Sequence, residues 1–320
     1  MSDCSSCSLP CETTSPAPRD AMQTRRRILQ AGFFVLFVLA PPLDIFRLDL
    51  NLGHFILFGH AWTLGLDGLM AGHGSAAHAA LNIILRGFLP LLGIVLLLGW
   101  VSWKYGRLYC GWLCPHFSVV EMINGLMRRA MGKFSLWDRS TEGEKRPDGS
   151  RVPARPVYWL LVLPAVAGFS FLWAVVLLTY LLTPSEVYGN LLHASLTLRQ
   201  GLFIGVATLL LSIEFTLARH LFCKFGCAVG VFQSFVWMAN RQGMVVSFDR
   251  DNASGCRGCY GACEEECPMR LKPRSIKRAM FTCTECARCI DACDQIQAPA
   301  GRPGLLEWTR GLQARVESDR

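Results

Sequence analysis

Four long uncharged segments constrain this chain more than any other feature. Residues 28–43, 87–103, 156–185 and 200–218 contain no charged residue except Glu214. About 20 apolar residues cross a hydrocarbon core of about 30 Å, so each segment is a candidate transmembrane helix, the first one being short. With 52% hydrophobic and 18% charged residues, the composition excludes a disordered chain and argues against a purely soluble enzyme. We therefore predict an all-α membrane domain with about four transmembrane helices.

The basic residues predict how these segments are oriented. Residues 104–155 contain ten Lys and Arg, and Arg25, Arg26 and Arg27 precede the first segment, whereas the other two connections are nearly free of them. Loops rich in Lys and Arg remain in the cytoplasm. The four spans then form two hairpins related by a pseudo-repeat, and both chain ends lie in the cytoplasm. These cytoplasmic loops also account for the net charge of +8, so nucleic-acid binding is not required to explain it. The apolar stretch 52–85 could be a re-entrant or interfacial helix or a fifth span.

Eight cysteines between residues 256 and 293 have iron–sulfur spacing. The second group follows the pattern C-x2-C-x2-C-x3-C, in which three thiolates hold one cluster and the fourth reaches a second cluster. We therefore expect two [4Fe-4S] clusters. The predicted ligands of one are Cys283, Cys286, Cys289 and Cys267. The predicted ligands of the other are Cys256, Cys259, Cys263 and Cys293.

The pattern departs from a bacterial ferredoxin in two places. Three residues separate Cys259 from Cys263, and Asp294 follows Cys293 where proline is usual. Paired zinc sites are the alternative, because zinc also takes C-x2-C pairs, but zinc sites seldom repeat this spacing twice so closely. Disulfides are disfavoured in a segment that is assigned to the reducing cytoplasm.

Two further cysteine pairs follow the second and fourth apolar segments. Cys110 and Cys114 form one C-x3-C pair, Cys223 and Cys227 form the other, and each is followed by an amphipathic or apolar segment, as in an internal repeat. Related by such pseudo-symmetry, the four thiols could converge at the cytoplasmic surface. They could then bind a further cluster or a soft metal such as Cu(I). The alternative is that these cysteines only pack in the interior.

These features divide the chain into four parts. We predict a disordered cytoplasmic tail over 1–24 and a transmembrane domain over 25–240. A ferredoxin-type α+β domain over 241–298 and a polar tail over 299–320 follow. The N-terminal tail carries Cys4, Cys7 and Cys11, for which a loose metal site is less favoured than no role.

The pattern resembles the bacterial membrane polyferredoxins that include NapH, the FixG/CcoG proteins and the membrane part of NosR. Cys110-Gly-Trp-Leu-Cys114-Pro115 resembles the first C-x3-C-P motif of that family. Cys223 to Cys227 resembles the second motif, although Ala228 replaces the proline. The stretch from Phe281 to Asp294 resembles the ferredoxin half of FixG/CcoG.

The resemblance implies an electron carrier of the bacterial inner membrane, or a subunit of a quinol dehydrogenase complex, with two cytoplasmic [4Fe-4S] clusters. It would relay electrons from quinol or a cytoplasmic donor to respiratory reductase or oxidase subunits, a cytochrome c or a ferredoxin-type protein. The alternative is a copper-reducing assembly factor for a haem-copper oxidase, which would use the C-x3-C pairs. No residue set for other substrate chemistry is visible, and a bound quinone is an open expectation.

Overall fold

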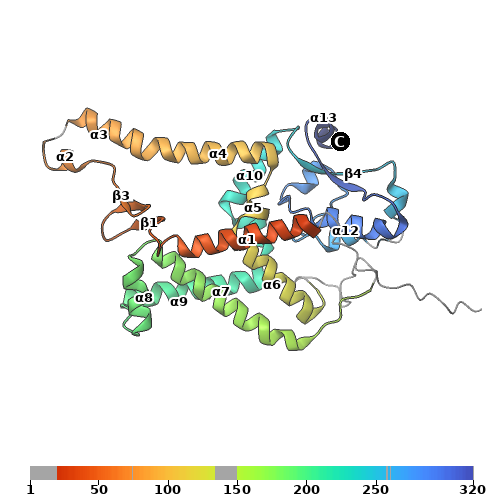
Figure 1. Cartoon of the computed structure of the whole chain (residues 1–320), viewed down its shortest axis with the longest axis horizontal. Helices are drawn as coiled ribbons and strands as arrows, with labels where there is room; N and C mark the ends of the chain where they lie inside the picture. Colours follow the sequence, from red (N-terminus) through yellow and green to blue (C-terminus); the bar gives the residue numbers. More distant parts are fainter. Residues whose placement is uncertain (1–19, 74, 134–149, 257–258, 260, 320) are drawn as a thin grey trace, which may run out of the picture.

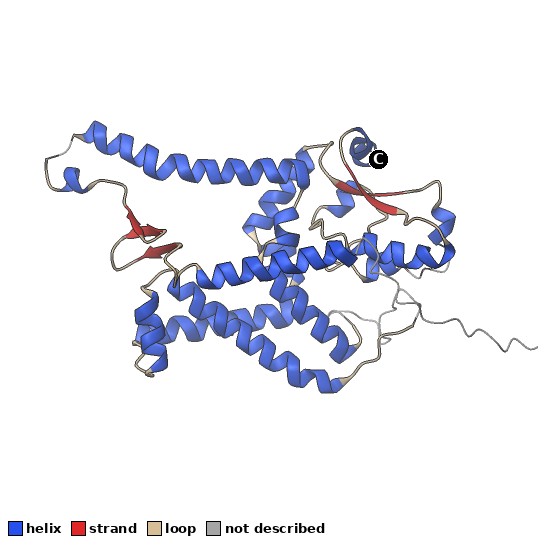
Figure 2. Cartoon of the chain, viewed as in Figure 1, coloured by secondary structure: helices blue, strands red, loops and turns tan. Residues whose placement is uncertain are grey.

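The computed structural model describes residues 20–73, 75–133, 150–256, 259 and 261–319. Cys4, Cys7 and Cys11 therefore lie outside the described residues. Within the described part, helices predominate, and two small antiparallel sheets lie toward opposite ends of the molecule (Figure 2).

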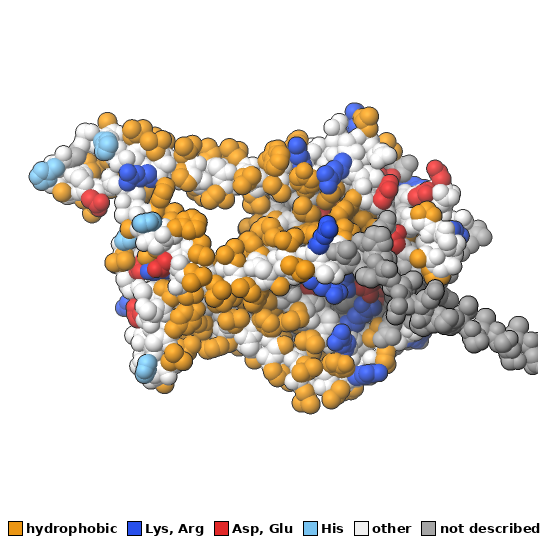
Figure 3. Space-filling model, in the orientation of Figure 1, with side chains coloured by type: hydrophobic (Ala, Val, Ile, Leu, Met, Phe, Trp, Pro, Cys, Tyr) orange, Lys and Arg blue, Asp and Glu red, His pale blue; other side chains and the backbone are white. Residues whose placement is uncertain are grey.

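Four helical stretches run lengthwise between those two ends (Figure 1). They are α1 (Asp20–Leu39), the continuous helix Ala76–Tyr105, α7 (Trp159–Thr179) and the helix Leu198–Ala218. The second comprises α3 (Ala76–Ile83), the π-helical turn η1 (Ile84–Phe88) and α4 (Leu89–Tyr105). The fourth comprises α9 (Leu198–Ile213) and the π-helical turn η3 (Glu214–Ala218). Their outer surfaces form a largely hydrophobic band (Figure 3).

Among the described residues, three helices are long and apolar enough to cross a membrane: Ala76–Tyr105, Pro156–Thr179 and Leu198–Ala218. They correspond to the last three predicted spans. The first predicted span, 28–43, lies mostly on α1 and is not among them. Three consecutive arginines occupy the N-terminal half of α1, and the helix ends at Leu39, before Pro41 and Pro42. Three membrane-crossing helices are thus supported.

The structure corrects the boundaries of the second and third spans. The second begins at Ala76 and not at residue 87. Stretch 52–85 is therefore neither an interfacial helix nor a separate span, because its last ten residues belong to that helix. The preceding part contains a three-stranded antiparallel sheet and a short helix: β1 (Phe46–Asp49), β2 (His54–Leu57), β3 (His60–Trp62) and α2 (Asp67–Met70). The third span ends at Thr179, and Pro184 then begins α8 (Pro184–Leu192).

The helices that follow the two C-x3-C pairs pack crosswise. The first pair lies around α5 (Leu108–Trp112) and is followed by α6 (Pro115–Met131); the second lies around the π-helical turn η4 (Phe222–Gly226) and is followed by α10 (Ala228–Ala239). Helix α6 packs against α7 of the second hairpin, whereas α10 packs against α4 of the first. This exchange draws the two cysteine pairs toward each other.

The cysteine-rich region is a small α+β unit that extends past its predicted end at residue 298. Strand β4 (Val245–Phe248) pairs antiparallel with β5 (Leu306–Thr309), and α13 (Leu312–Asp319) packs against β4. Residues expected in a polar tail therefore complete the domain. The remaining helices of this unit are η5 (Ala253–Cys256), α11 (Ala262–Glu265), η6 (Lys277–Met280), α12 (Arg288–Gln297) and η7 (Ala298–Ala300).

One hydrophobic core joins this unit to the membrane helices. It contains Phe117 of α6 and Trp237 of α10 together with Cys223 and four cysteines of the α+β unit. Lys277 strengthens the junction because its ammonium group donates to the carbonyl oxygens of Trp237 and Asn240 at the end of α10. The cysteine-rich unit is thus packed directly against the helices and is not held by a linker alone.

Candidate metal centres

Four cysteines line a cavity between the β4–β5 ladder and α12. They are Cys267, Cys283, Cys286 and Cys289, the four that the spacing assigns to one cluster. The remaining walls of the cavity are mainly apolar, with Val246, Met269, Leu271 and Met280. All four thiols are buried.

The other four cysteines of this unit line a second cavity. They are Cys256, Cys259, Cys263 and Cys293, which again is the grouping that the spacing predicts. Phe248, Ile296 and Leu306 supply apolar walls, and Arg274 adds a positive charge. The extra residue between Cys259 and Cys263 and the replacement of proline by Asp294 do not prevent the four side chains from facing one cavity.

The donor set and the cavity walls fit an iron–sulfur cluster. Burial raises the pKa of Cys267 to about 11 and that of Cys263 to about 12, so these thiols stay protonated unless a cationic group replaces the proton. Among the described residues, no three His, Cys, Asp or Glu side chains gather closely enough to hold a single metal ion. Four cysteines that line one cavity suit a cluster, in which each thiolate binds a different iron.

The two C-x3-C pairs converge, as their repeat predicts. Cys114 is the N-cap of α6 and Cys227 the N-cap of α10, and both have the same extended backbone, with φ/ψ of −62°/116° and −78°/109°. Burial raises the pKa of Cys114 to about 11, and the nearby Cys110 and Cys227 thiols contribute to the increase. Burial also raises the pKa of Cys223, and the nearby Cys114 and Cys110 thiols add to this increase. Thiols from both hairpins therefore lie close enough to affect one another electrostatically.

Buried hydrogen-bond donors surround the converging pairs. The Nη2 atom of Arg107, a side chain only 1% exposed, donates to the carbonyl oxygen of Cys223 at 2.7 Å and lies 3.9 Å from the sulfur of Cys110. Its Nε and Nη1 atoms, and Nε2 of Gln233, are buried with no hydrogen-bond partner among the described residues. Gly230 permits this arrangement, since a Cβ there would overlap Nη2 of Arg107.

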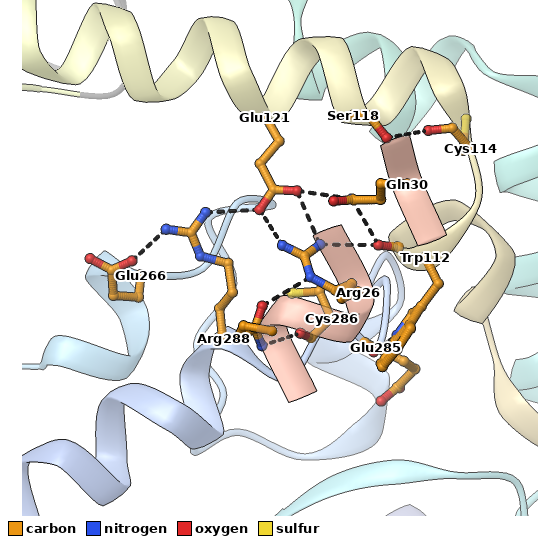
Figure 4. Close-up of polar contacts among 12 residues, drawn as sticks. Arg26, Gln30, Trp112, Cys114, Ser118, Glu121, Glu266, Glu285, Cys286 and Arg288 are labelled. Carbon is orange, nitrogen blue, oxygen red and sulfur yellow. Dashed lines mark hydrogen bonds and ion pairs between the residues drawn. The ribbon is translucent and has the colours of Figure 1, made fainter. Parts of the chain in front are cut away.

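An ion-pair network attaches α1 and α6 to the cysteine-rich unit (Figure 4). Glu121 lies 2.5 Å from Nη2 of Arg26 and 2.9 Å from Nη1 of Arg288. Glu266 joins Arg288 at 2.6 Å and Arg128 at 2.7 Å. Burial alone would raise the pKa of Glu121, but the guanidinium groups of Arg26 and Arg288 outweigh it and lower the pKa to about 2. The network therefore stays fully charged near neutral pH.

Helix α5 touches the cluster-binding loop through its backbone. A Cβ at Gly111 would overlap the carbonyl oxygen of Thr284, which lies between Cys283 and Cys286. The indole of Trp112 donates to the carbonyl oxygen of Glu285 at 3.0 Å. Arg26 and Gln30 of α1 hold the same part of α5, since both donate to the Gly111 carbonyl oxygen, at 3.0 and 3.1 Å.

Sequence reasoning missed several residues of this site. Arg26 was expected only as a flanking positive charge, whereas it is 2% exposed and bonds to Glu121. Glu121 pairs with Arg26 and Arg288, each of which lies far from it in the sequence. The intramembrane position of Glu214 was noted, but not its partner His116, whose Nε2 atom lies 3.3 Å away. Arg107 had no sequence signal except its proximity to Cys110.

Comparisons with known proteins give one matching family and several related proteins. Residues 87–133 match the family described as a 4Fe-4S binding domain. The chain is 27% identical over 281 residues to the ferredoxin-type protein NapH of Escherichia coli, which covers 84% of this chain and 85% of that protein. The corresponding protein of Haemophilus influenzae is 26% identical over the same shares.

A third relative is longer than the matched region. The putative electron transport protein YccM of Escherichia coli is 24% identical over 226 residues, which is 70% of this chain but only 56% of that protein. No solved structure matches the chain.

The matches and the apolar helices define a class: this is a membrane protein that carries a 4Fe-4S domain of the ferredoxin type. More particularly, it is similar to ferredoxin-type proteins named NapH and to a putative electron transport protein, in agreement with the resemblance to the membrane polyferredoxins.

Proposed function

We propose that this protein relays electrons within the bacterial inner membrane, between quinol or a cytoplasmic donor and a respiratory reductase partner. In this proposal α1 is a fourth span, both chain ends are cytoplasmic, and the cysteine-rich unit lies on the cytoplasmic side. The distribution of charge supports this orientation, because basic side chains concentrate toward the cysteine-rich end of the visible face (Figure 3).

The observation that carries the proposal is the division of eight cysteines between two cavities. Each cavity offers four thiols and mainly apolar walls, which together could hold one [4Fe-4S] cluster. When bound, such a cluster accepts and releases one electron. The surrounding side chains bury the four thiols of the Cys283 cavity, and Arg274 places a positive charge beside the Cys256 and Cys263 cavity. Burial and nearby charge are the means by which a protein tunes a cluster potential.

The direct test replaces one ligand from each cavity. We expect Cys286→Ala to abolish the electron paramagnetic resonance (EPR) signal of one reduced cluster and Cys256→Ala that of the other, each with a loss of about four irons per chain. An unchanged EPR spectrum in both variants would contradict the ligand assignment.

The relay itself is tested by adding a soluble quinol to the anaerobic, oxidised protein in detergent. Bleaching of the cluster absorbance at a rate that depends on quinol concentration supports a quinol donor. Bleaching by a reduced ferredoxin but not by quinol assigns the donor to the cytoplasm. Failure of both donors to reduce loaded clusters contradicts a relay.

A further inference from the structure

We propose that Cys110, Cys114, Cys223 and Cys227 hold a third [4Fe-4S] cluster, shared between the two hairpins and in direct contact with the ferredoxin-type centre of Cys283 and Cys286. The inference rests on the proposed electron-transfer function and adds a redox centre to it. The two pairs are 113 positions apart in the sequence, so neither hairpin could form this centre alone.

The matched 4Fe-4S binding domain needs cysteine ligands from outside residues 87–133. Residues 87–133 match a 4Fe-4S binding domain, yet they contain only two cysteines, Cys110 and Cys114. A cubane bound entirely by cysteine needs four. The structure supplies the other two from the second hairpin, because Nη2 of Arg107 lies 3.9 Å from the sulfur of Cys110 and donates to the carbonyl oxygen of Cys223 at 2.7 Å. The Cys110 thiol also donates, at 3.5 Å, to Oε1 of Gln233 on α10, the helix that Cys227 caps.

The surrounding donors indicate an anionic ligand. Arg107 is a buried cation whose Nε and Nη1 atoms have no partner in the part of the chain that the structure describes, and the same holds for Nε2 of Gln233. Buried polar groups are nearly always hydrogen-bonded, and a buried charge requires a counter-charge. A cubane with four thiolate ligands carries net negative charge, and its sulfides accept hydrogen bonds. It would satisfy the guanidinium and the amide together.

The same observations disfavour a single copper ion. A soft metal ion bound by three or four thiolates would draw the sulfurs to one point, and the described residues contain no such cluster of ligands. A polynuclear, anionic cluster fits both the spread of the four thiols and the buried arginine.

Two contacts link this centre to the cysteine-rich unit, called the ferredoxin-type unit from here on. Gly111, the residue after Cys110, lies against the backbone of Thr284, and Trp112 donates to the carbonyl oxygen of Glu285. Thr284 and Glu285 connect two predicted ligands of the neighbouring cluster, Cys283 and Cys286. One-electron exchange across this contact oxidises one centre and reduces the other, with no bond formed or broken.

The test compares one cysteine from each hairpin with one from the ferredoxin-type unit. After anaerobic purification, we expect Cys110→Ser and Cys223→Ser each to lower the iron content by about one third and to remove the same spectral component. Both variants should keep the two signals that depend on Cys256 and Cys286. Cys286→Ser should also lose about one third of the iron, but through a different signal.

The outcomes separate the two proposals. If Cys110→Ser and Cys223→Ser retain the full wild-type content of iron and sulfide, there is no third cluster, and loss of stoichiometric Cu(I) binding by these variants would assign copper instead. If only one of the two variants loses iron, the cluster is not shared between hairpins. If Cys286→Ser changes nothing, the proposed function fails in its ligand assignment, independently of the third centre.

The contact between the centres has its own readout. In the fully reduced wild-type protein, we expect the EPR signal of the Cys286-dependent cluster to be broadened by the neighbouring spin and to sharpen in Cys110→Ser. An unchanged line shape overturns the proposed contact even if the third cluster is present.

Discussion

The two cysteine regions of this protein are assembled in different ways. In the ferredoxin-type unit, eight cysteines fall within 38 residues, and a few tight turns and short helices bring them to two cavities. At the C-x3-C pairs, four cysteines come from two distant hairpins, and the crosswise packing of α6 and α10 brings them together. The first region depends on local spacing and the second on tertiary structure, which predicts that they respond differently to loss of their metal.

The largest difference should appear when the clusters are removed. On oxidative removal of iron in the presence of a chelator, we expect amide-hydrogen protection over residues 241–298 to collapse, while α7 and α9 remain protected. The isolated β4–β5 pair and four-residue α11 cannot sustain the unit alone, and metal binding in such units is coupled to folding. Hydrogen exchange before and after chelation measures this. Equal loss of protection over residues 241–298 and over α7 and α9 would contradict the claim that only the ferredoxin-type unit depends on its metal for folding.

Breaking the ion-pair network should have the next largest effect. Glu121→Gln leaves Arg26 and Arg288 buried without their carboxylate, and we expect it to weaken docking of the ferredoxin-type unit by about 3 kcal/mol. The measurement is the midpoint temperature at which this unit becomes sensitive to protease. Glu307→Gln, on the exposed side of β5, is the matched control and should behave as wild type.

The same carboxylate gives a pH dependence of known sign. The folded protein lowers the pKa of Glu121 from 4.5 to about 2, so its contribution is fully present above about pH 4.5 and is lost as the pH falls toward 2. The wild-type protein should lose about 3 kcal/mol of docking stability over that range from this group. Glu121→Gln should lack this component. A parallel decline in the variant and the wild type would show that Glu121 is not responsible.

Removing the buried charge at the C-x3-C pairs should alter one centre only. We expect Arg107→Gln to make the midpoint potential of the third centre more negative by roughly 60 mV, because the reduced, more anionic state loses a nearby cation. The two ferredoxin-type potentials should be unchanged in the same redox titration. The exposed Arg241→Gln serves as the control. A shift of all three potentials would mean that Arg107 acts through the general fold.

The smallest expected effect is at the contact between the regions. Gly111→Ala should push α5 away from Thr284, leaving iron content intact but slowing electron exchange between the centres several-fold. Gly125→Ala on α6 is the matched control, because a Cβ there meets nothing within 4 Å. Freeze-quench EPR after a reducing pulse measures the exchange. Equal rates in the two variants would remove the electron path through Gly111.

The same contrast explains what the sequence could predict. Local spacing sufficed to divide the eight cysteines between two cavities, since ligands so close together can reach a common site in few ways. Apolar length sufficed for three membrane-crossing helices. For α1, apolar length could not reveal the second role of Arg26, which bonds to the Gly111 carbonyl oxygen and to Glu121 of α6 as well as adding to the charge pattern.

Long-range contacts could not be predicted in this way. The pairing of β5 with β4 turned an expected tail into part of the domain, because two short strands far apart carry no signal for each other. Arg107 and Trp112 likewise look like ordinary residues near a span. Their importance comes from Cys223 and Glu285, which only the folded chain brings beside them.

The most direct test of the account is the iron and acid-labile sulfide content of the wild-type chain, purified anaerobically in detergent. Three clusters predict about twelve of each per chain. About eight of each would remove the third centre and leave the C-x3-C pairs for another ligand. Little iron with stoichiometric zinc would contradict the electron-transfer account as a whole.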